Sequence, residues 1–539
     1  MSLKRRENDL VDLRTRCDFL AANAWPKGLP NRTRGSPSLK LKDFLILLLL
    51  TVGAFLIIGY HPAVEDAEIY VPGIKKVLNP GLYPFGSEFF ESHARLTLYP
   101  NLIAESLRLT HLSLDWVMLL WHVLSIFLVL LACWKLSTLC FDDDAARWGG
   151  VALVAALLTI PVAGTALYII DEYLNPRALA LFAALFAVGG VLTRRYFVAA
   201  LWLVLAAPLH PLMSVFGASL SAAIIFVREF SDARATANPS PAAARLAALL
   251  IPLGVSVRLP SAAYRDAIQL RPYFFILRWH WYEWLGILAP LLLLWRLGRL
   301  GRRHQLNAAS LLCRACIAYA LVYFVIALLT TIPPQFLALV RYQPMRSLQL
   351  VYVVLFLVGG GFLGKWVLRD RVWRWLALFV PLCFGMFYGQ RQLFPATPHI
   401  EWPGRVPQND WLQAFAWIRA NTPTDAIFAL NPQHMAMSGE DQHGFRALAE
   451  RSMLADAVKD SGALTMFPDL PLAEHWKRQV QAQQGWEDFQ AADFERLRRD
   501  WGVTWVVLDQ RNLRGLDCPY ANRTLRVCQV PAIAAESHE

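Results

Sequence analysis

Three carboxylates stand close together in the stretch HPAVEDAEIY, residues 61–70: Glu65, Asp66 and Glu68. The stretch directly follows the apolar run 41–60, whose two charges both lie at its start. At 1.5 Å per residue a helix of that run is about 30 Å long, which is enough to cross the hydrocarbon core of a bilayer. Acids at the end of a membrane helix are costly unless they face water or act on a ligand, so we expect at least one to be functional. The alternative is that they cap a helix or carry charge into solvent.

A second acidic pair, Asp171 and Glu172, lies in a later loop between apolar runs. On the same predicted side of the membrane, two further loops carry arginines: Arg271, Arg278, Arg341 and Arg346. Arginine offers phosphate oxygens two parallel N–H donors, and a carboxylate can take a proton from an attacking hydroxyl. This combination favours a lipid-linked phosphate as the ligand. The alternatives are an ordinary loop for the acids and contact with lipid headgroups for the arginines.

The composition is typical of a helical membrane protein. Hydrophobic residues make up 56% of the 539 residues and charged residues 17%, against about 25% charged residues in a typical globular domain. The net charge is +11, and the basic residues lie mostly in short loops between apolar runs. Because that distribution is the orientation signal of membrane proteins, we expect no nucleic acid among the partners.

The apolar runs predict a polytopic all-α membrane domain over residues 41–389, with about eleven transmembrane helices. The expected spans lie near residues 41–60, 114–134, 148–163, 178–192, 196–208, 212–227, 246–257, 285–295, 308–330, 348–364 and 375–388. Residues 1–40 carry an excess of Lys and Arg and are expected to form a cytoplasmic tail. The first extracytoplasmic loop then covers residues 61–112, and residues 390–539 form a small soluble extracytoplasmic α/β domain. These features predict a multi-pass protein of the plasma (inner) membrane.

Local patterns predict helices and strands outside the spans. In the first loop, one helix begins at Pro72 and ends at residues 79–81, and another begins at Pro100. In the C-terminal domain the expected helices are 411–420 and 494–499, and the expected strands are 426–430 and 503–508. Cys518 and Cys528 bracket a turn-rich stretch and are placed to form a disulfide if this domain lies outside the cytoplasm.

The order of these features resembles the GT-C superfamily of integral membrane glycosyltransferases. The shared features are a cytoplasmic N-terminus, a first span, a long outer loop with the acids of EDAE and surface helices, and a soluble outer domain after the last span. The resemblance implies transfer of a hexose or pentose from a polyprenyl-phosphate donor, with inversion, on the extracytoplasmic face. The acceptor it implies is a glycan, lipid or protein, and membrane lipid is a further partner.

In that family an acid of the first outer loop acts as general base or metal ligand. Carried over to this sequence, the acid is Asp66 or Glu65, with Asp66 preferred and Glu68 in support. The sequence reads EDAE where the family has one isolated pair, so the choice among these acids stays open.

The resemblance also assigns the other charged loops. Asp171 and Glu172 stand where some members place a second acid, and Asp66 with Asp171 would hold a Mg²⁺ or Mn²⁺ ion, if one assists. Arginines of the outer loops would hold the donor phosphate: Arg341 or Arg346 from one loop, and one of Arg265, Arg271 and Arg278 from the other.

Two other functions compete with glycosyl transfer. A transporter or flippase for lipid-linked sugars predicts ionisable residues along the spans and an internal repeat, and the sequence has neither feature. A non-catalytic envelope assembly protein predicts that Asp66 and the outer arginines can be replaced together without loss of function.

Overall fold

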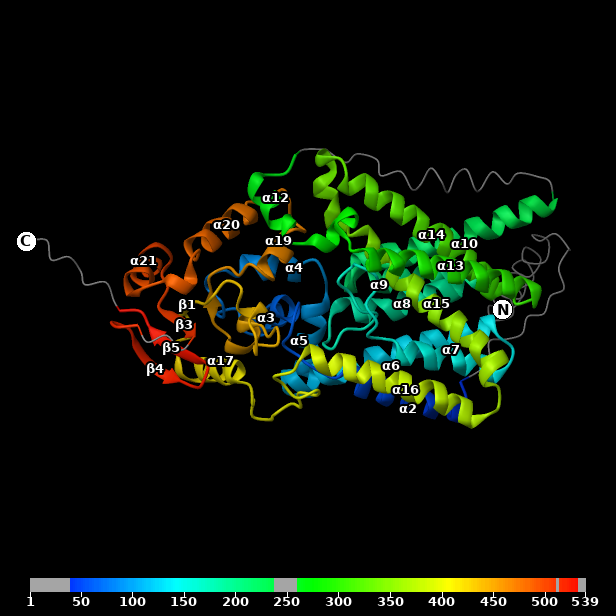
Figure 1. Ribbon diagram of the computed structural model, residues 1–539, viewed down its shortest axis with the longest axis horizontal. Helices are drawn as coiled ribbons and strands as arrows, with labels where there is room; N and C mark the ends of the chain where they lie inside the picture. Colours follow the sequence, from blue (N-terminus) through cyan, green and yellow to red (C-terminus); the bar gives the residue numbers. More distant parts are fainter. Residues whose placement is uncertain (1–38, 237–258, 510–512, 532–539) are drawn as a thin grey trace, which may run out of the picture. The chain divides into compact units, whose positions relative to one another are not determined.

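The apolar runs form long helices in the computed structural model, which describes residues 39–236, 259–509 and 513–531 (Figure 1). Within these residues, seven helical segments have the length and apolar composition to cross a membrane. They are Leu41–Ile58 (α2), Leu114–Cys140 (α6), Pro211–Ser231 in α10 (Pro211–Thr236), Trp281–Arg303 (α13), Asn307–Thr331 (α14), Pro334–Leu368 and Val372–Leu393 (α16). Two shorter apolar helices, α8 (Pro176–Leu192) and α9 (Tyr196–Leu209), pack against each other and against α10. The protein is therefore mostly helical, as predicted.

The predicted number of about eleven spans is not confirmed. The run 148–163 forms only the helix α7 (Asp144–Ala156), because turns and bends replace helix from residue 157 to residue 175. The run 246–257 lies outside the described residues.

Close contact between α7 and α15 (Leu348–Leu363) depends on glycines. A Cβ atom on Gly149 would lie 2.5 Å from the carbonyl oxygen of Gly360. In a bilayer the hydrophobic effect does not drive helices together, so their association depends on close packing, which small residues allow. The first turn of α15 carries Gln349, whose Nε2 donates to the carbonyl oxygen of Ile169 at 2.7 Å. The packing of α7 and α15 thus anchors the loop that holds the second acidic pair.

The first loop contains three helices, α3 (Ala67–Leu78), α4 (Glu88–Ala94) and α5 (Tyr99–Thr110). The predicted start of a helix at Pro72 is wrong, because the helix begins at Ala67 and includes the proline. Residues 67–74 are all buried, so packing stabilises these turns despite the missing N–H donor. The helix predicted to begin at Pro100 is confirmed as α5, which begins one residue earlier, at Tyr99. The helix α4 was not predicted from the sequence.

A five-stranded sheet lies near the C-terminus, in the order β2 (Ser452–Met453), β1 (Ile427–Ala429), β3 (Trp505–Asp509), β5 (Leu525–Gln529) and β4 (Asp517–Ala521). The first three strands are parallel, and β5 and β4 add to them in antiparallel fashion. Alternate residues of β3 enter two apolar clusters, one on each face. The predicted strands correspond to β1 and β3, and the predicted helices to α17 (Asp410–Asn421) and α21 (Ala491–Trp501). A disulfide joins Cys518 to Cys528 across β4 and β5.

The first loop and the C-terminal region (residues 409–531) are bound to each other. Residues from Lys40 onward form one compact unit, in which α3 packs against α18 (Phe445–Ala449) and α4 against α19 (Asp460–Leu464). The backbone N–H of Glu65 donates to the carbonyl oxygen of Gln442 at 2.9 Å. The C-terminal region thus fixes the backbone of the acidic stretch, while a domain boundary near residue 390 stays a prediction.

Candidate active site

A cavity of about 260 Å³ brings both acidic loops together with residues of the C-terminal region. Its wall includes the four acids Glu65, Asp66, Asp171 and Glu172. It also includes the four cations Arg177, Arg271, Arg346 and Lys459. A smaller chamber of about 90 Å³ shares six wall residues with it: Asp66, Arg177, Arg271, Tyr273, Arg346 and Lys459. The fold therefore places acids and cations from distant parts of the chain around one space.

Asp66 stands immediately before α3 and turns its side chain toward Lys459, whose Nζ lies 3.2 Å from Oδ1. Burial on its own raises the pKa of Asp66, but the charges of Lys459 and then of Arg346 and Arg177 lower the pKa below its ordinary value. The group is thus a carboxylate at neutral pH, and its side chain is 37% exposed. Asp66 is therefore able to accept a proton or a hydrogen bond from a molecule in the cavity.

Glu65 shares the ammonium group of Lys459 with Asp66. Its backbone has a left-handed conformation, with φ of 55°, which is uncommon for a residue with a side chain. The hydrogen bond to Gln442 holds that conformation in place. Backbone strain of this kind concentrates at functional sites.

Asp171 is held by two neighbours in its own loop. Its Oδ2 accepts hydrogen bonds from Arg177 Nη2 and Asn175 Nδ2. The other side-chain atom of Asn175, Oδ1, caps α8 by accepting the backbone N–H of Ala178 at 2.9 Å. The Asn-Pro start of α8 therefore fixes the acid and the arginine together.

Glu172 lies deeper than Asp171. It is 3% exposed, and its Oε2 has no hydrogen-bond partner among the residues that the structure describes. Burial, and then the charge of Asp171, raises the pKa of Glu172 to about 8. At neutral pH Glu172 is therefore largely protonated and adds little negative charge to the cavity wall.

Arg271 and Arg346 present hydrogen-bond donors to both chambers. Arg346 lies over the ring of Tyr273, with its Cζ 5.5 Å from the ring centroid. Arg271 donates from Nη2 to Ser461 Oγ at 2.8 Å, and a Cβ on Gly462 would lie 2.9 Å from that nitrogen. The Nε of both arginines is buried and lacks a hydrogen-bond partner within the described ranges. Because both arginines line the cavity, their guanidinium groups would pair with an anion bound there.

Two of the arginines predicted as candidates for phosphate binding make contacts elsewhere. Arg341 lies 4.0 Å from Asp469 and covers the ring of its neighbour Tyr342. Arg278 is exposed, donates to Gln269 and lies over a phenylalanine ring. Neither side chain belongs to the wall of either chamber. We therefore do not retain Arg341 and Arg278 as phosphate ligands.

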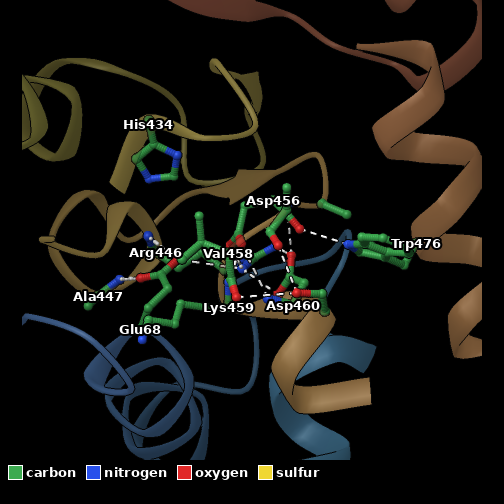
Figure 2. Close-up of polar contacts among 12 residues, drawn as sticks. Glu68, His434, Arg446, Ala447, Asp456, Val458, Lys459, Asp460 and Trp476 are labelled. Atoms are coloured by element: carbon green, nitrogen blue, oxygen red, sulfur yellow. Dashed lines mark hydrogen bonds and ion pairs between the residues drawn. The ribbon is translucent and has the colours of Figure 1, made fainter. Parts of the chain in front are cut away.

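Glu68 is sealed inside the contact between the first loop and the C-terminal region (Figure 2). Its two oxygens accept the backbone N–H groups of Arg446 and Ala447, each at 2.9 Å. Burial raises the pKa of Glu68 to about 8 against the lowering effect of Arg446. The contact requires a glycine at Gly444, because a Cβ there would lie 2.7 Å from Glu68 Cβ. Glu68 lies outside the cavity wall, so we no longer retain it among the catalytic candidates.

Several residues of the cavity had no assigned role. Lys459 and Arg177 line both chambers, and Tyr70, His93 and His210 line the smaller one. Arg177 was within reach of sequence analysis, since Asn175-Pro176 marks the helix start that places it beside Asp171. Lys459 was not, because a single lysine almost 400 residues from its partners leaves no local pattern.

The carboxylates of the cavity do not fit a divalent metal ion. Within the described ranges, no three His, Cys, Asp or Glu side chains gather as a possible metal-binding group. Lys459 contacts Glu65 and Asp66, and Arg177 contacts Asp171, so a cation already contacts one oxygen of each of these acids and would compete with a metal ion. The metal site predicted at Asp66 and Asp171 is not supported, and no step below uses it.

Comparison with known proteins gives a family match to a short part of the chain. A family model described as a domain of unknown function (DUF6798) matches residues 409–462, which include Arg446 and Lys459. No curated protein matches the chain.

The chain is also similar to solved structures of the oligosaccharyltransferase of Archaeoglobus fulgidus. The structure tethered to an acceptor peptide with the NVT sequon has 13% identity and a TM-score of 0.47, covering 87% of this chain and 69% of that one. The AglB complex with an inhibitory peptide and a dolichol-phosphate has 13% identity and a TM-score of 0.42, covering 86% and 69%. The complex with Zn and sulfate has 14% identity and a TM-score of 0.42, covering 86% and 67%.

Proposed function

We propose that this protein is an integral membrane glycosyltransferase of the GT-C type. It moves a sugar from a polyprenyl-phosphate donor to an acceptor on the extracytoplasmic face. One observation carries the proposal: an ionised acid, Asp66, lines the same cavity as the side chains of Arg271 and Arg346. A group that accepts a proton and a pair of donors that hold a phosphate are what this transfer requires.

The donor phosphate binds between Arg271 and Arg346. Both side chains hold fixed positions through Ser461 and Tyr273, so little side-chain entropy is lost on binding. Apolar residues of α10 line the smaller chamber next to the arginines: Leu212, Met213 and Phe216. This wall suits the first isoprene units of the lipid, whose remaining length continues into the bilayer.

The reaction takes place beside Asp66. The oxygen of the acceptor hydroxyl attacks the anomeric carbon of the sugar, and the hydroxyl proton passes to the Asp66 carboxylate. The bond from that carbon to the phosphate oxygen breaks, and its electron pair leaves with the polyprenyl phosphate. The positive charges of Arg271 and Arg346 stabilise the leaving phosphate. Attack opposite the leaving group inverts the anomeric centre.

Donor binding also prepares the base. In the free protein, Lys459, Arg346 and Arg177 lower the pKa of Asp66. A bound phosphate offsets part of that positive charge, so the pKa of Asp66 rises toward the range in which a carboxylate removes a proton well. The acid is therefore a stronger base in the donor complex than in the free protein.

Two features support a position of the cavity outside the cytoplasm. The disulfide between Cys518 and Cys528 is typical of an oxidising compartment. The basic residues of segment 1–40 favour a cytoplasmic N-terminus.

A reconstituted transfer assay tests the proposal. The purified chain in liposomes receives a panel of radiolabelled polyprenyl-phosphate sugars, and transfer of label from the lipid is measured. We expect one donor to be consumed, and Arg271→Ala to lower that rate while Arg278→Ala leaves it unchanged. Label that changes leaflet without leaving the lipid would instead establish a flippase.

A further inference from the structure

One ammonium group holds the two adjacent acids of the first loop. Lys459 Nζ contacts a carboxylate oxygen of Glu65 and lies 3.2 Å from Oδ1 of Asp66. The lysine side chain is 7% exposed, whereas the acids are 34% and 37% exposed. The cation is thus more deeply buried than its partners, which open onto the cavity.

Lys459 keeps its charge in this position. An ammonium group that leaves water loses solvation free energy, and only a charged or hydrogen-bonded partner offsets that loss. Burial on its own lowers the pKa of Lys459, but the charges of Glu65 and then Asp66 raise it above its ordinary value. The cavity therefore contains a permanent cation at neutral pH.

A buried ion network fixes the turn that carries Lys459 (Figure 2). Arg446 donates to both oxygens of Asp460, at 3.0 and 2.8 Å. Asp456 accepts the backbone N–H of Lys459 through Oδ1. Arg446 also lies 3.5 Å from Glu68, which belongs to the same helix start as the cavity acids. The network therefore holds the ammonium group and the acids in fixed positions relative to each other.

The remaining acids leave little room for a metal ion. Asp171 contacts Arg177, and the buried Glu172 is largely protonated at neutral pH. A divalent ion takes several carboxylate oxygens as ligands, and a bound lysine or arginine competes for them. Three of the four cavity acids already contact such a cation.

We propose that Lys459 is the resident cation of this site and takes the place of a divalent metal ion. The inference rests on the proposed glycosyl transfer for its chemical meaning. An ammonium group has three N–H donors. The contacts to Glu65 and Asp66 use two of them, and the third is directed to a phosphate in the cavity that Lys459 lines. Lys459 makes and breaks no covalent bond, and its charge stabilises the leaving phosphate as Mg²⁺ would.

Manganese binding tests the proposal without reference to activity. The full chain in detergent micelles is titrated with Mn²⁺, and the free ion is followed by electron paramagnetic resonance. The wild-type chain and Asp66→Asn are expected to bind Mn²⁺ alike, because the acids are already paired. Lys459→Ala is expected to gain one site, and the double variant Lys459→Ala with Asp66→Asn is expected to lose it.

Lys477→Ala serves as the matched control. Lys477 belongs to the same region, is 35% exposed and pairs with Asp266 at 2.6 Å. This variant should bind Mn²⁺ as the wild-type chain does. If Lys459→Ala does not fold, the titration is repeated with Lys459→Met, which keeps the length of the side chain but has no charge. Mn²⁺ binding by the wild-type chain that Asp66→Asn removes would overturn the proposal, as would a folded Lys459 variant that gains no site.

The transfer assay adds a second measurement. Wild-type transfer should be unchanged by EDTA. Lys459→Ala should lose about 100-fold to 1,000-fold in kcat and recover part of it with Mn²⁺. Wild-type transfer that EDTA abolishes and Mn²⁺ restores would contradict the proposal. If no donor is consumed at all, the proposed function fails, but the Mn²⁺ titrations still decide the role of Lys459.

Discussion

Two charged clusters meet where the first loop contacts the C-terminal region, and they differ in their access to the cavity. The open cluster consists of Glu65, Asp66 and Lys459, and its acids are 34% and 37% exposed. The sealed cluster consists of Glu68, Arg446, Asp456 and Asp460, whose side chains are 0% or 1% exposed. Each cluster surrounds one cation with a larger number of acids. The two clusters contain similar residues, so only the exposure of its acids to the cavity distinguishes the open cluster as a candidate for chemistry.

The two clusters also depend on each other. Asp460 follows Lys459 in the chain, and Glu68 follows Asp66 by two residues. Arg446 contacts both Glu68 and Asp460, so the sealed cluster fixes the distance across the open one. The buried ion pairs of the sealed cluster fix the positions of the surrounding residues, and the partly exposed Asp66 beside them can contact a substrate.

The largest expected effect comes from Asp66→Asn in the open cluster. This change removes the proton acceptor, so kcat/KM of the transfer should fall by about 100-fold to 10,000-fold. Stability should change by about 1 kcal/mol or less, because Glu65 still pairs with Lys459. Kinetics and thermal unfolding of the same preparation check both values. An Asp66→Asn protein with full activity would remove Asp66 from the mechanism.

The sealed cluster should show the opposite pattern. Arg446→Met leaves Glu68 and Asp460 without their cation, so the free energy of unfolding should fall by about 3–5 kcal/mol. Glu68→Gln loses only part of the hydrogen bonding of Glu68, so the free energy of unfolding should fall by only about 1–3 kcal/mol. Denaturant unfolding measures both changes. The Glu68→Gln protein that folds should keep most of its specific activity, and a loss as large as that of Asp66→Asn would return Glu68 to the catalytic group.

A smaller effect is expected at the phosphate donors. Arg346→Lys keeps the charge but loses the planar fork, so KM for the lipid donor should rise about tenfold with little change in kcat. The matched change Arg341→Lys lies outside the cavity and should leave KM unaltered. Initial rates over a range of donor concentrations separate the two constants. Equal effects of both changes would show that the arginines act through general surface charge.

The smallest effect concerns a third buried group, which joins the first loop to the C-terminal region. His443 Nε2 lies 3.0 Å from Glu401 Oε1, and His61 Nδ1 lies 2.7 Å from the same oxygen. Burial on its own lowers the pKa of His443, but Glu401 raises it from 6.5 to about 9. Stability from the charged His443 is therefore complete below pH 6.5 and is lost as the pH rises through about 9.

Thermal unfolding from pH 6 to pH 10 checks this dependence. The Tm of the wild-type chain should fall more steeply across this range than the Tm of His443→Gln, which has no such group to lose. Parallel curves would show that the charge of His443 does not stabilise the fold.

Much of the fold was predictable because its signals are local. Apolar runs located the long helices, and short apolar runs located β1 and β3. The start of α3 at Ala67 was not predictable, because Pro72 suggested a helix start and only tertiary packing overrides that signal. The predicted number of spans was not confirmed, in part because the apolar residues 157–163 form turns and bends and not helix.

The site was predictable only in part. Asp66, Asp171 and Arg346, which line the cavity, were among the predicted residues because charged groups at the edge of a membrane helix are costly unless they have a function. The sequence could not separate Asp66 from Glu68, since both lie in one short acidic stretch and their surroundings come from residues 442–460. It also could not separate Arg346 from Arg341, because the direction of a side chain in a loop depends on long-range packing.

The most direct test of the central claim is a cryo-electron microscopy structure of the full chain with a polyprenyl phosphate bound. The account predicts phosphate density within hydrogen-bonding distance of the Arg271 and Arg346 guanidinium groups, beside Asp66. It also predicts that the first lipid units lie along α10. A phosphate bound outside both chambers, in a protein that still transfers sugar, would contradict the account.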